Sequence, residues 1–150
     1  MKQIIGRKEK ISLHEWGLKM VTAKIDTGAY TSAIHSDFAQ EERDDLGNKV
    51  LTFTILPQSH RKYSGKIIRT TDYTTKKVKN SFGQAEDRYK IMTKITLFGE
   101  EFEAAFTLSD RSDMKNPILL GRKLLKGRYM VDVDLTYQSQ KAAKTISKRL

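Results

Sequence analysis

Apolar and polar residues alternate with a period of two along several stretches of the chain, and this pattern predicts β-strands with one buried face. Residues 18–25 show the alternation, and residues 51–55 repeat it. Residues 89–97 and 102–108 each carry one apolar face and are separated by a Phe-Gly-Glu-Glu turn, which predicts a hairpin. The chain is therefore expected to be built mainly from strands.

Shorter apolar runs predict further strands. They lie at residues 3–5, 11–13, 33–36, 67–68, 118–120 and 129–133. Helical turns are expected at residues 40–46, ended by Gly47-Asn48, and at residues 122–126, ended by Gly127. Many strands and only one or two short helices predict an all-β protein, with its strands arranged as a closed or sandwiched barrel.

A length of 150 residues fits one domain with a substantial core, and no linker or internal repeat divides it. We assign residues 1–137 to this domain and residues 138–150 to a basic C-terminal tail, either a short helix or a frayed end. No apolar run is long enough for a membrane span, and the N-terminus lacks the apolar core of a signal peptide. We therefore expect a cytoplasmic protein with no membrane partner.

Charge changes the picture more than size does. The 28 Lys and Arg residues against 18 Asp and Glu residues give a formal net charge of +10. This charge favours an acidic partner, such as an acidic peptide or a nucleic acid, but a solvated lysine-rich surface would give the same composition. Between positions 60 and 79 the basic residues are Arg61, Lys62, Lys66, Arg69, Lys76, Lys77 and Lys79, against the single acid Asp72.

The first candidate for chemistry follows the strand at 18–25 directly. Asp26-Thr27-Gly28-Ala29 would place a carboxylate at the tip of a rigid strand and turn, where a scaffold can fix its position. Gly28 would allow close approach of backbone or substrate, and the Thr27 hydroxyl could lock the loop. The tripeptide Asp-Thr-Gly is also ordinary turn chemistry, so it needs support from a second motif.

The second motif is Ile118-Leu119-Leu120-Gly121-Arg122, an apolar strand that leads through glycine into a basic helical turn. The two motifs together resemble those of the retropepsin-like aspartic proteases. The longer run at residues 25–35 is similar to a bacterial family of retropepsin-like endopeptidases that are often labelled ATP-dependent zinc proteases. The resemblance implies a closed acid-protease barrel, in which the late strand packs beside the loop that carries the catalytic aspartate.

The resemblance also implies roles for individual residues. Asp26, Thr27 and Gly28 would form the catalytic loop, whereas Ala29, Tyr30 and Arg122 would bind substrate. Viral relatives carry an acid where Tyr30 stands, and that acid pairs with the arginine of the second motif. The partner of Arg122 is therefore open here, between Asp37 and a substrate carboxylate.

Aspartic proteases need two carboxylates that share one proton. This chain has one Asp-Thr-Gly, and the next candidate, Asp132-Val133-Asp134, lacks the threonine and the glycine. The second carboxylate should therefore be Asp26 of another subunit, so a twofold homodimer is expected as the active form. By the resemblance, Thr27 would hydrogen-bond across the twofold axis.

Neither zinc nor ATP finds support in the residues. His14-Glu15 would need a second histidine at position 18, which is leucine, and no phosphate-binding Gly-rich loop is present. We therefore predict no metal and no cofactor. Related domains occur with ATP-dependent glutamate-ligase systems that modify a ribosomal protein, so the resemblance suggests glutamate-rich peptides as substrates.

Two functions from different classes follow. The favoured one is an aspartic-type endopeptidase that hydrolyses amide bonds; the alternative is a non-catalytic basic β-barrel that binds RNA or a ribosomal protein. By the resemblance, residues 58–88 cover the interval that carries the flap of a retropepsin, a hairpin that closes over the peptide. A basic solvated loop remains the other interpretation of that interval.

Overall fold

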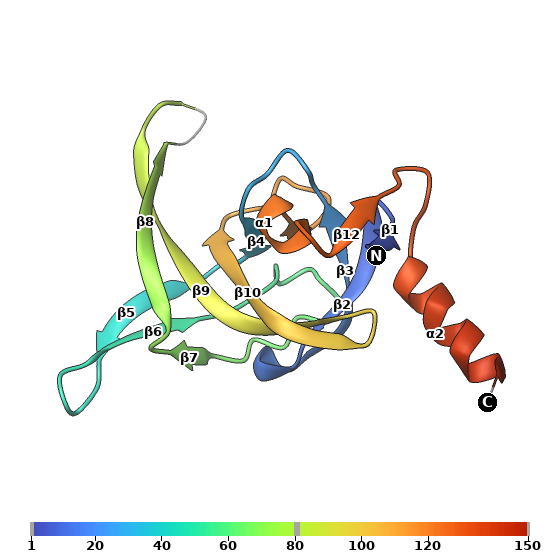
Figure 1. The fold of residues 1–150 in the computed structure, drawn as a ribbon. Helices are drawn as coiled ribbons and strands as arrows, with labels where there is room; N and C mark the ends of the chain where they lie inside the picture. The colour runs from blue at the N-terminus through green and yellow to red at the C-terminus, as the bar shows by residue number, and fades with distance from the viewer. Residues whose placement is uncertain (1, 80–81, 150) are drawn as a thin grey trace.

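The computed structural model describes residues 2–79 and 82–149, and within this part of the chain six strands close into a barrel (Figure 1). Around the barrel the strands run in the order β10, β4, β11, β3, β2 and β9, and β9 pairs again with β10. Their bounds are β2 Lys8–Leu13, β3 Leu18–Ile25, β4 Ser32–His35, β9 Ala85–Leu97, β10 Glu100–Ser109 and β11 Ile118–Leu120. The all-β closed barrel expected from the sequence is confirmed.

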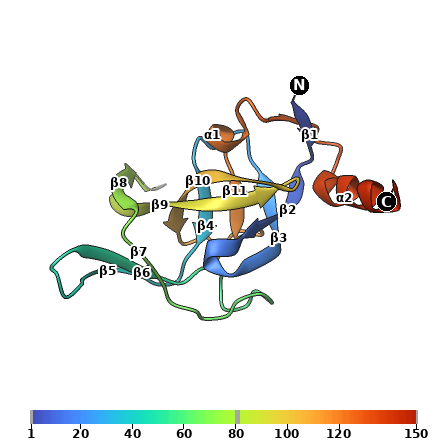
Figure 2. The same ribbon diagram turned by 60° about the horizontal axis from the view of Figure 1, so that its bottom comes forward.

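The remaining elements extend this barrel. The additional strands are β1 Gln3–Ile5, β5 Ala39–Arg43, β6 Lys49–Phe53, β7 Ile68–Thr70, β8 Tyr73–Lys79 and β12 Tyr129–Val131. The helices are the 3-10 turn η1 His14–Trp16, α1 Arg122–Leu125 and α2 Gln138–Arg149. Strands β5, β6 and β7 form a separate sheet on the side of the barrel opposite α2 (Figures 1 and 2).

The barrel interior explains the alternation in the sequence. Ile91, Ile95 and Phe106 are fully buried on the inward face of the β9–β10 hairpin, as predicted. The hairpin turns through Phe98 and Gly99, both at positive φ, which is the geometry that a two-residue turn between twisted strands requires. Trp16 closes the core by packing edge-on against Phe53 at 5.4 Å between ring centroids.

One predicted element is wrong. Residues 40–46 were expected to form a helical turn, but β5 pairs with β6 along its whole length, from Ala39 opposite Phe53 to Arg43 opposite Lys49. The ladder with β6 outweighs the weak helical preference of a short acidic segment. The following turn is held instead by the Asp44 carboxylate, which accepts hydrogen bonds from the backbone N–H groups of Leu46 and Asn48.

The C-terminal segment is a helix, one of the two forms that the sequence left open. Glu9, which is fully buried on β2, anchors its first turn. The Glu9 carboxylate accepts hydrogen bonds from the backbone N–H groups of Gln138 and Ser139, each at 3.0 Å, and from that of Gly6 at 2.8 Å. A carboxylate at a helix N-terminus satisfies donors that the helix itself cannot. The boundary between residues 137 and 138 stays a prediction.

No helix in the described part of the chain combines the length and the apolar character needed to cross a bilayer.

Candidate active site

Asp26 lies at the end of β3, where the barrel scaffold fixes its backbone. Its N–H donates to the carbonyl oxygen of Leu120 at 2.9 Å, and its own carbonyl accepts from the N–H of Ala29 at 3.2 Å. The carboxylate is half-buried and accepts a hydrogen bond from the N–H of Gly28 at 2.9 Å. The carboxylate is thus held in place and still accessible to a reactant, as the sequence predicted.

The two sequence motifs meet in space. Strand β11 pairs in parallel with β3, with Leu120 opposite Ile25, and antiparallel with β4. A Cβ atom at Gly121 would lie 2.8 Å from the carbonyl oxygen of Tyr30 and 2.9 Å from that of Ala29. Only glycine fits at this contact, because both obstacles are backbone atoms that cannot move aside.

Helix α1 completes the support of the Asp26 loop. The backbone N–H groups of Arg122 and Lys123 donate to the carbonyl oxygens of Ala29 and Tyr30 at 2.8 and 2.9 Å. The Ser32 hydroxyl accepts a hydrogen bond from the N–H of Gly121 at 3.1 Å. The first turn of α1 therefore satisfies its free N–H groups with the carbonyls of the loop that carries Asp26.

Arg122 has a partner that the sequence did not suggest. Its Nη1 donates to the carbonyl oxygen of Thr27 at 2.9 Å, and its guanidinium lies 5.8 Å from the centre of the Tyr30 ring. Asp37, one of the two partners considered, instead contacts His35 at 2.6 Å. Arg122 therefore supports the Asp26 loop, and its role in substrate binding stays a prediction, as do those of Ala29 and Tyr30.

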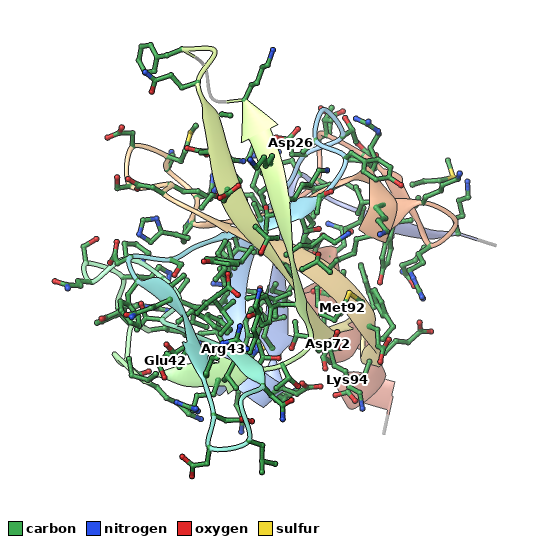
Figure 3. The ribbon with its side chains drawn as sticks, turned by 90° about the vertical axis from the view of Figure 1, so that its left-hand side faces the viewer. Asp26, Glu42, Arg43, Asp72, Met92 and Lys94 are labelled. Carbon is green, nitrogen blue, oxygen red and sulfur yellow. The ribbon has the colours of Figure 1, made fainter. Side chains whose placement is uncertain are left out.

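A long hairpin stands beside this loop. Strand β8 pairs with the first half of β9, from Tyr73 opposite Ile91 to Lys79 opposite Ala85, and the outer part of this pair projects from the barrel (Figure 1). We call residues 73–91 the arm. The arm extends toward the same end of the barrel as Asp26 (Figures 1 and 3). The side chains of Lys76, Lys77 and Lys79 are exposed along it.

The first part of the basic segment, which includes Arg61, Lys62 and Lys66, lies in a loop outside the arm. Residues 57–67 precede β7 as a loop, and Lys62 binds the barrel through its Nζ, which donates to the carbonyl oxygens of Lys19 and Met20. The loop tip predicted at residues 81–84 lies partly outside the described residues. Within the described part of residues 58–88, the arm is therefore the candidate for the flap.

Two residues near the site escaped the sequence analysis. His35 is fully buried at the end of β4, and its Nδ1 accepts a hydrogen bond from the backbone N–H of Arg111 at 2.8 Å. Burial lowers the pKa of Arg111, whereas the charge of Asp26 raises it. Arg111 sits in a polar connection without periodicity, so no local signal marked it as a neighbour of Asp26.

The other aspartates considered as partners, Asp132 and Asp134, lie in a turn that differs from the Asp26 loop. Asp132 and Asp134 are exposed in a turn after β12, where the Asp132 carboxylate accepts from the N–H of Asp134 at 3.0 Å. Among the described residues no three His, Asp or Glu side chains are grouped so that they could hold a metal ion. The zinc named in the label of similar proteins therefore finds no fitting ligand set in residues 2–79 and 82–149.

Several known proteins with similar sequences are considerably longer than this chain. A probable alpha-L-glutamate ligase of Desulfotalea psychrophila is 31% identical over 131 residues, which cover 87% of this chain and 28% of the ligase. The corresponding proteins of Parasynechococcus marenigrum and Shewanella pealeana are both 32% identical, over 91% and 87% of this chain and over 29% and 28% of the relatives. The chain thus spans less than a third of each of these relatives.

A solved structure and a family model cover nearly the whole chain. The crystal structure of the Legionella pneumophila protein Lpg0085, of unknown function, superposes with a TM-score of 0.71 at 26% identity, covering 93% of this chain and 99% of that one. The model of the family described as retropepsin-like aspartic endopeptidase RimB matches residues 4–142. Since that match takes in the barrel, the Asp26 loop and the Gly121-Arg122 turn, the chain belongs to this family.

Proposed function

We propose that this chain is an aspartic-type endopeptidase whose active form is a twofold homodimer. The observation that carries the proposal is the half-buried Asp26 carboxylate, which accepts a hydrogen bond from the Gly28 N–H. The loop that carries it is hydrogen-bonded to β11 and α1. A retropepsin-like family membership supports a protease, and a single Asp-Thr-Gly per chain requires a second chain.

In the proposed dimer two Asp26 carboxylates share one proton, because two like charges at close range cannot both ionise. The ionised carboxylate takes a proton from a water molecule, which attacks the peptide carbonyl. The protonated carboxylate donates its proton toward the carbonyl oxygen, and the pair titrates as a unit. Thr27, which is exposed beside Asp26, would join the two loops across the axis.

The surface beside the loop combines apolar and basic side chains. Thr27 and the exposed ring of Tyr30 border a groove whose other lining residues include the apolar side chains of Leu125, Tyr129 and Val131. Aromatic and arginine side chains are enriched at protein–protein interfaces and lysine is depleted, so Tyr30 and Arg122 favour an interface here and Lys2, Lys123 and Lys126 oppose it. A cytoplasmic location remains part of this proposal.

The proposed substrates are acidic or glutamate-rich peptides. A net charge of +10 attracts acidic chains, and relatives of this chain are named for glutamate ligation. A peptidase with this preference would remove residues that such a ligase adds. Nucleic acid is the less favoured partner.

The main test replaces Asp26 by Asn. We expect hydrolysis of a glutamate-rich peptide to fall by at least about a hundredfold, because Asn cannot exchange the proton and general acid–base catalysis typically contributes about 10²- to 10⁴-fold. The Asp134→Asn variant removes the same charge at an exposed site and should keep wild-type activity. Circular dichroism and sedimentation should show an unchanged fold and dimer. Hydrolysis retained by pure Asp26→Asn protein would remove Asp26 from the mechanism.

A second test concerns metal and nucleotide. Hydrolysis should persist in EDTA and without ATP, since the proposed chemistry uses only carboxylates and water. Rates are measured before and after dialysis against chelator, and again after zinc is added back. Activity that is lost on chelation and restored by zinc would contradict the proposed mechanism.

A further inference from the structure

A buried histidine, His35, contacts both ends of the loop between β10 and β11, residues 110–117. The backbone N–H of His35 donates to the carbonyl oxygen of Pro117 at 2.8 Å, and its Nδ1 accepts from the backbone N–H of Arg111, also at 2.8 Å. Because Nδ1 accepts, the ring proton lies on Nε2, which donates to Asp37 at 2.6 Å. Asp37, His35 and Arg111 thus form one hydrogen-bonded chain.

The guanidinium of Arg111 has donors to spare. Its Nε donates to the carbonyl oxygen of Asn116 at 3.2 Å, and the side chain is half-buried. Within the described chain, neither Nη group has a hydrogen-bond partner and no carboxylate lies within ion-pair distance of this side chain. A partly desolvated cation without a counter-charge is costly unless something else supplies one.

Two charged groups from other elements act on this guanidinium. Burial is the largest cause that lowers the pKa of Arg111; Asp26 opposes it, and Arg88 on β9 adds to it. Arg88 has its own counter-charge, because its Nε lies 2.8 Å from Glu86 Oε1. Arg111 therefore carries a positive charge that acts on Asp26 but forms no ion pair with a carboxylate of the described chain.

We propose that Arg111 is a specificity-determining residue, which binds a carboxylate of the peptide next to the bond that Asp26 cleaves. In this proposal, which rests on the proposed function, His35 and Asp37 are positioning residues that aim Arg111 by holding its backbone. A guanidinium offers two parallel N–H donors that match the geometry of a carboxylate, and the contact gains strength where water is partly excluded. The carboxylate can be a Glu or Asp side chain, or the free C-terminus of a short peptide.

The test compares four peptides of equal length, with Glu or Gln beside the scissile bond and with an amidated or a free C-terminus. For Arg111→Gln, kcat/KM on the amidated Glu peptide should fall at least about tenfold, and that on the amidated Gln peptide less than about threefold. Arg111→Lys should recover part of the difference. If the loss follows the free C-terminus instead, the carboxylate bound is terminal.

The matched control is Lys115→Gln, which removes the same charge from an exposed position in the same loop. This variant should keep the wild-type ratio between the Glu and Gln peptides. A ratio that is unchanged in Arg111→Gln, or that falls equally in both variants, would overturn the assignment of Arg111.

The positioning role has its own test. Asp37→Asn keeps an oxygen that can accept from His35 Nε2, whereas Asp37→Ala removes it, and Asp37 is exposed enough for both variants to fold. The Glu-to-Gln ratio should fall about threefold or more in Asp37→Ala and stay near the wild type in Asp37→Asn. Equal ratios in both variants would show that Arg111 does not depend on this chain of hydrogen bonds.

Binding separates this inference from the proposed function. Fluorescence anisotropy with Asp26→Asn protein measures the affinity for the same labelled peptides without turnover. Preference for the carboxylate peptide that disappears with Arg111→Gln would support the binding role even if wild-type protein hydrolysed neither peptide. If Asp26→Asn protein bound all four peptides equally while wild-type protein hydrolysed them, Arg111 would have no role in specificity and the proposed peptidase would stand.

Discussion

The Asp26 loop and the arm differ in what holds them, although both reach the same end of the barrel. The loop donates a hydrogen bond to β11 and accepts others from the first turn of α1 and from the Arg122 side chain, all within residues 120–123. The outer arm is a two-stranded ladder, and its register from Lys76 opposite Arg88 to Lys79 opposite Ala85 joins only its own strands.

This difference matches the two tasks that the proposed function would give to the loop and the arm. A carboxylate that moves protons has to be held within a fraction of an ångström, and packed strands supply that precision. A segment that closes over an extended peptide has to move, and few contacts with the barrel permit it. Substitutions should therefore have steep effects in the loop and shallow effects on the arm.

The largest contrast is expected between two glycines. Gly121→Ala forces a Cβ against two carbonyl oxygens of the Asp26 loop, so we expect a loss of about 2 to 3 kcal/mol in the free energy of unfolding and at least about tenfold in kcat. Gly83→Ala, near the tip of the arm, meets no atom within 4 Å and suffers only from its positive φ of 79°. About 1 kcal/mol is expected there.

Urea unfolding and peptide hydrolysis of both glycine variants measure the predicted losses in the free energy of unfolding and in kcat. Equal losses would mean that the loop is no more constrained than the arm.

An intermediate effect concerns the base of the arm, where the Tyr73 hydroxyl donates to Glu41 on β5 at 2.9 Å. Burial, together with this hydrogen bond, raises the pKa of Tyr73 to about 12. The unfolded chain ionises near pH 10, so the stabilisation is complete below pH 10 and is lost as the pH rises toward 12. Tyr73→Phe should cost about 1 kcal/mol at pH 8, and this difference should shrink at pH 11 to 12.

Unfolding curves at pH 8, 10 and 11.5 give the comparison, and the tyrosinate absorbance of the two proteins identifies the group. Tyr129, whose pKa burial also raises to about 12, is present in both proteins and cancels. If the difference in the free energy of unfolding stayed constant with pH, the hydrogen bond between Tyr73 and Glu41 would not be what holds the base of the arm.

The smallest effect is expected on the outer arm. Replacing Lys76, Lys77 and Lys79 by Gln should raise KM for an acidic peptide about two- to fivefold at low salt and leave kcat unchanged, because exposed ion pairs contribute little each. Salt should imitate the substitution, since such charges are screened beyond about 8 Å at physiological ionic strength. A neutral peptide should respond to neither change.

The control triple replaces three exposed lysines of the barrel strands and the β6 sheet, Lys24, Lys49 and Lys94, by Gln. Equal effects of the two triples would mean that the arm is a solvated surface. If the arm triple instead weakened RNA binding in a protein without hydrolysis, the alternative of a binding module would replace the peptidase.

Alternation was sufficient to predict an all-β barrel, and the family resemblance carried by the two motifs implied the contact between the Asp26 loop and the Gly121-Arg122 turn. Both signals are local or belong to a recurring pair of motifs, and burial of one strand face reinforces them. Strand β5 was missed because its residues are polar on both faces, and only the ladder with β6 makes it a strand. Strand β6 was expected to bury one face only, but all its residues after Lys49 are buried, including the polar Thr52.

The contact between His35 and Arg111 joins residues that are 76 positions apart in the sequence. It depends on how the loop 110–117 closes, and loop closure leaves no periodic trace in the sequence. The partner of Arg122 was missed for a related reason, since a backbone carbonyl, here that of Thr27, is present in every residue type. Such contacts become visible only after the strands have set the distances.

The buried Glu9 links the C-terminal helix to strand β2 near the N-terminus by hydrogen bonds. A protein shortened to residues 1–137 would lose the Gln138 and Ser139 donors and leave a carboxylate in the interior with only the N–H of Gly6. Unmet hydrogen bonding of a buried charge costs several kcal/mol. Proteolysis that clips the last helix should therefore destabilise the barrel, although the helix carries no residue that we place in the proposed chemistry.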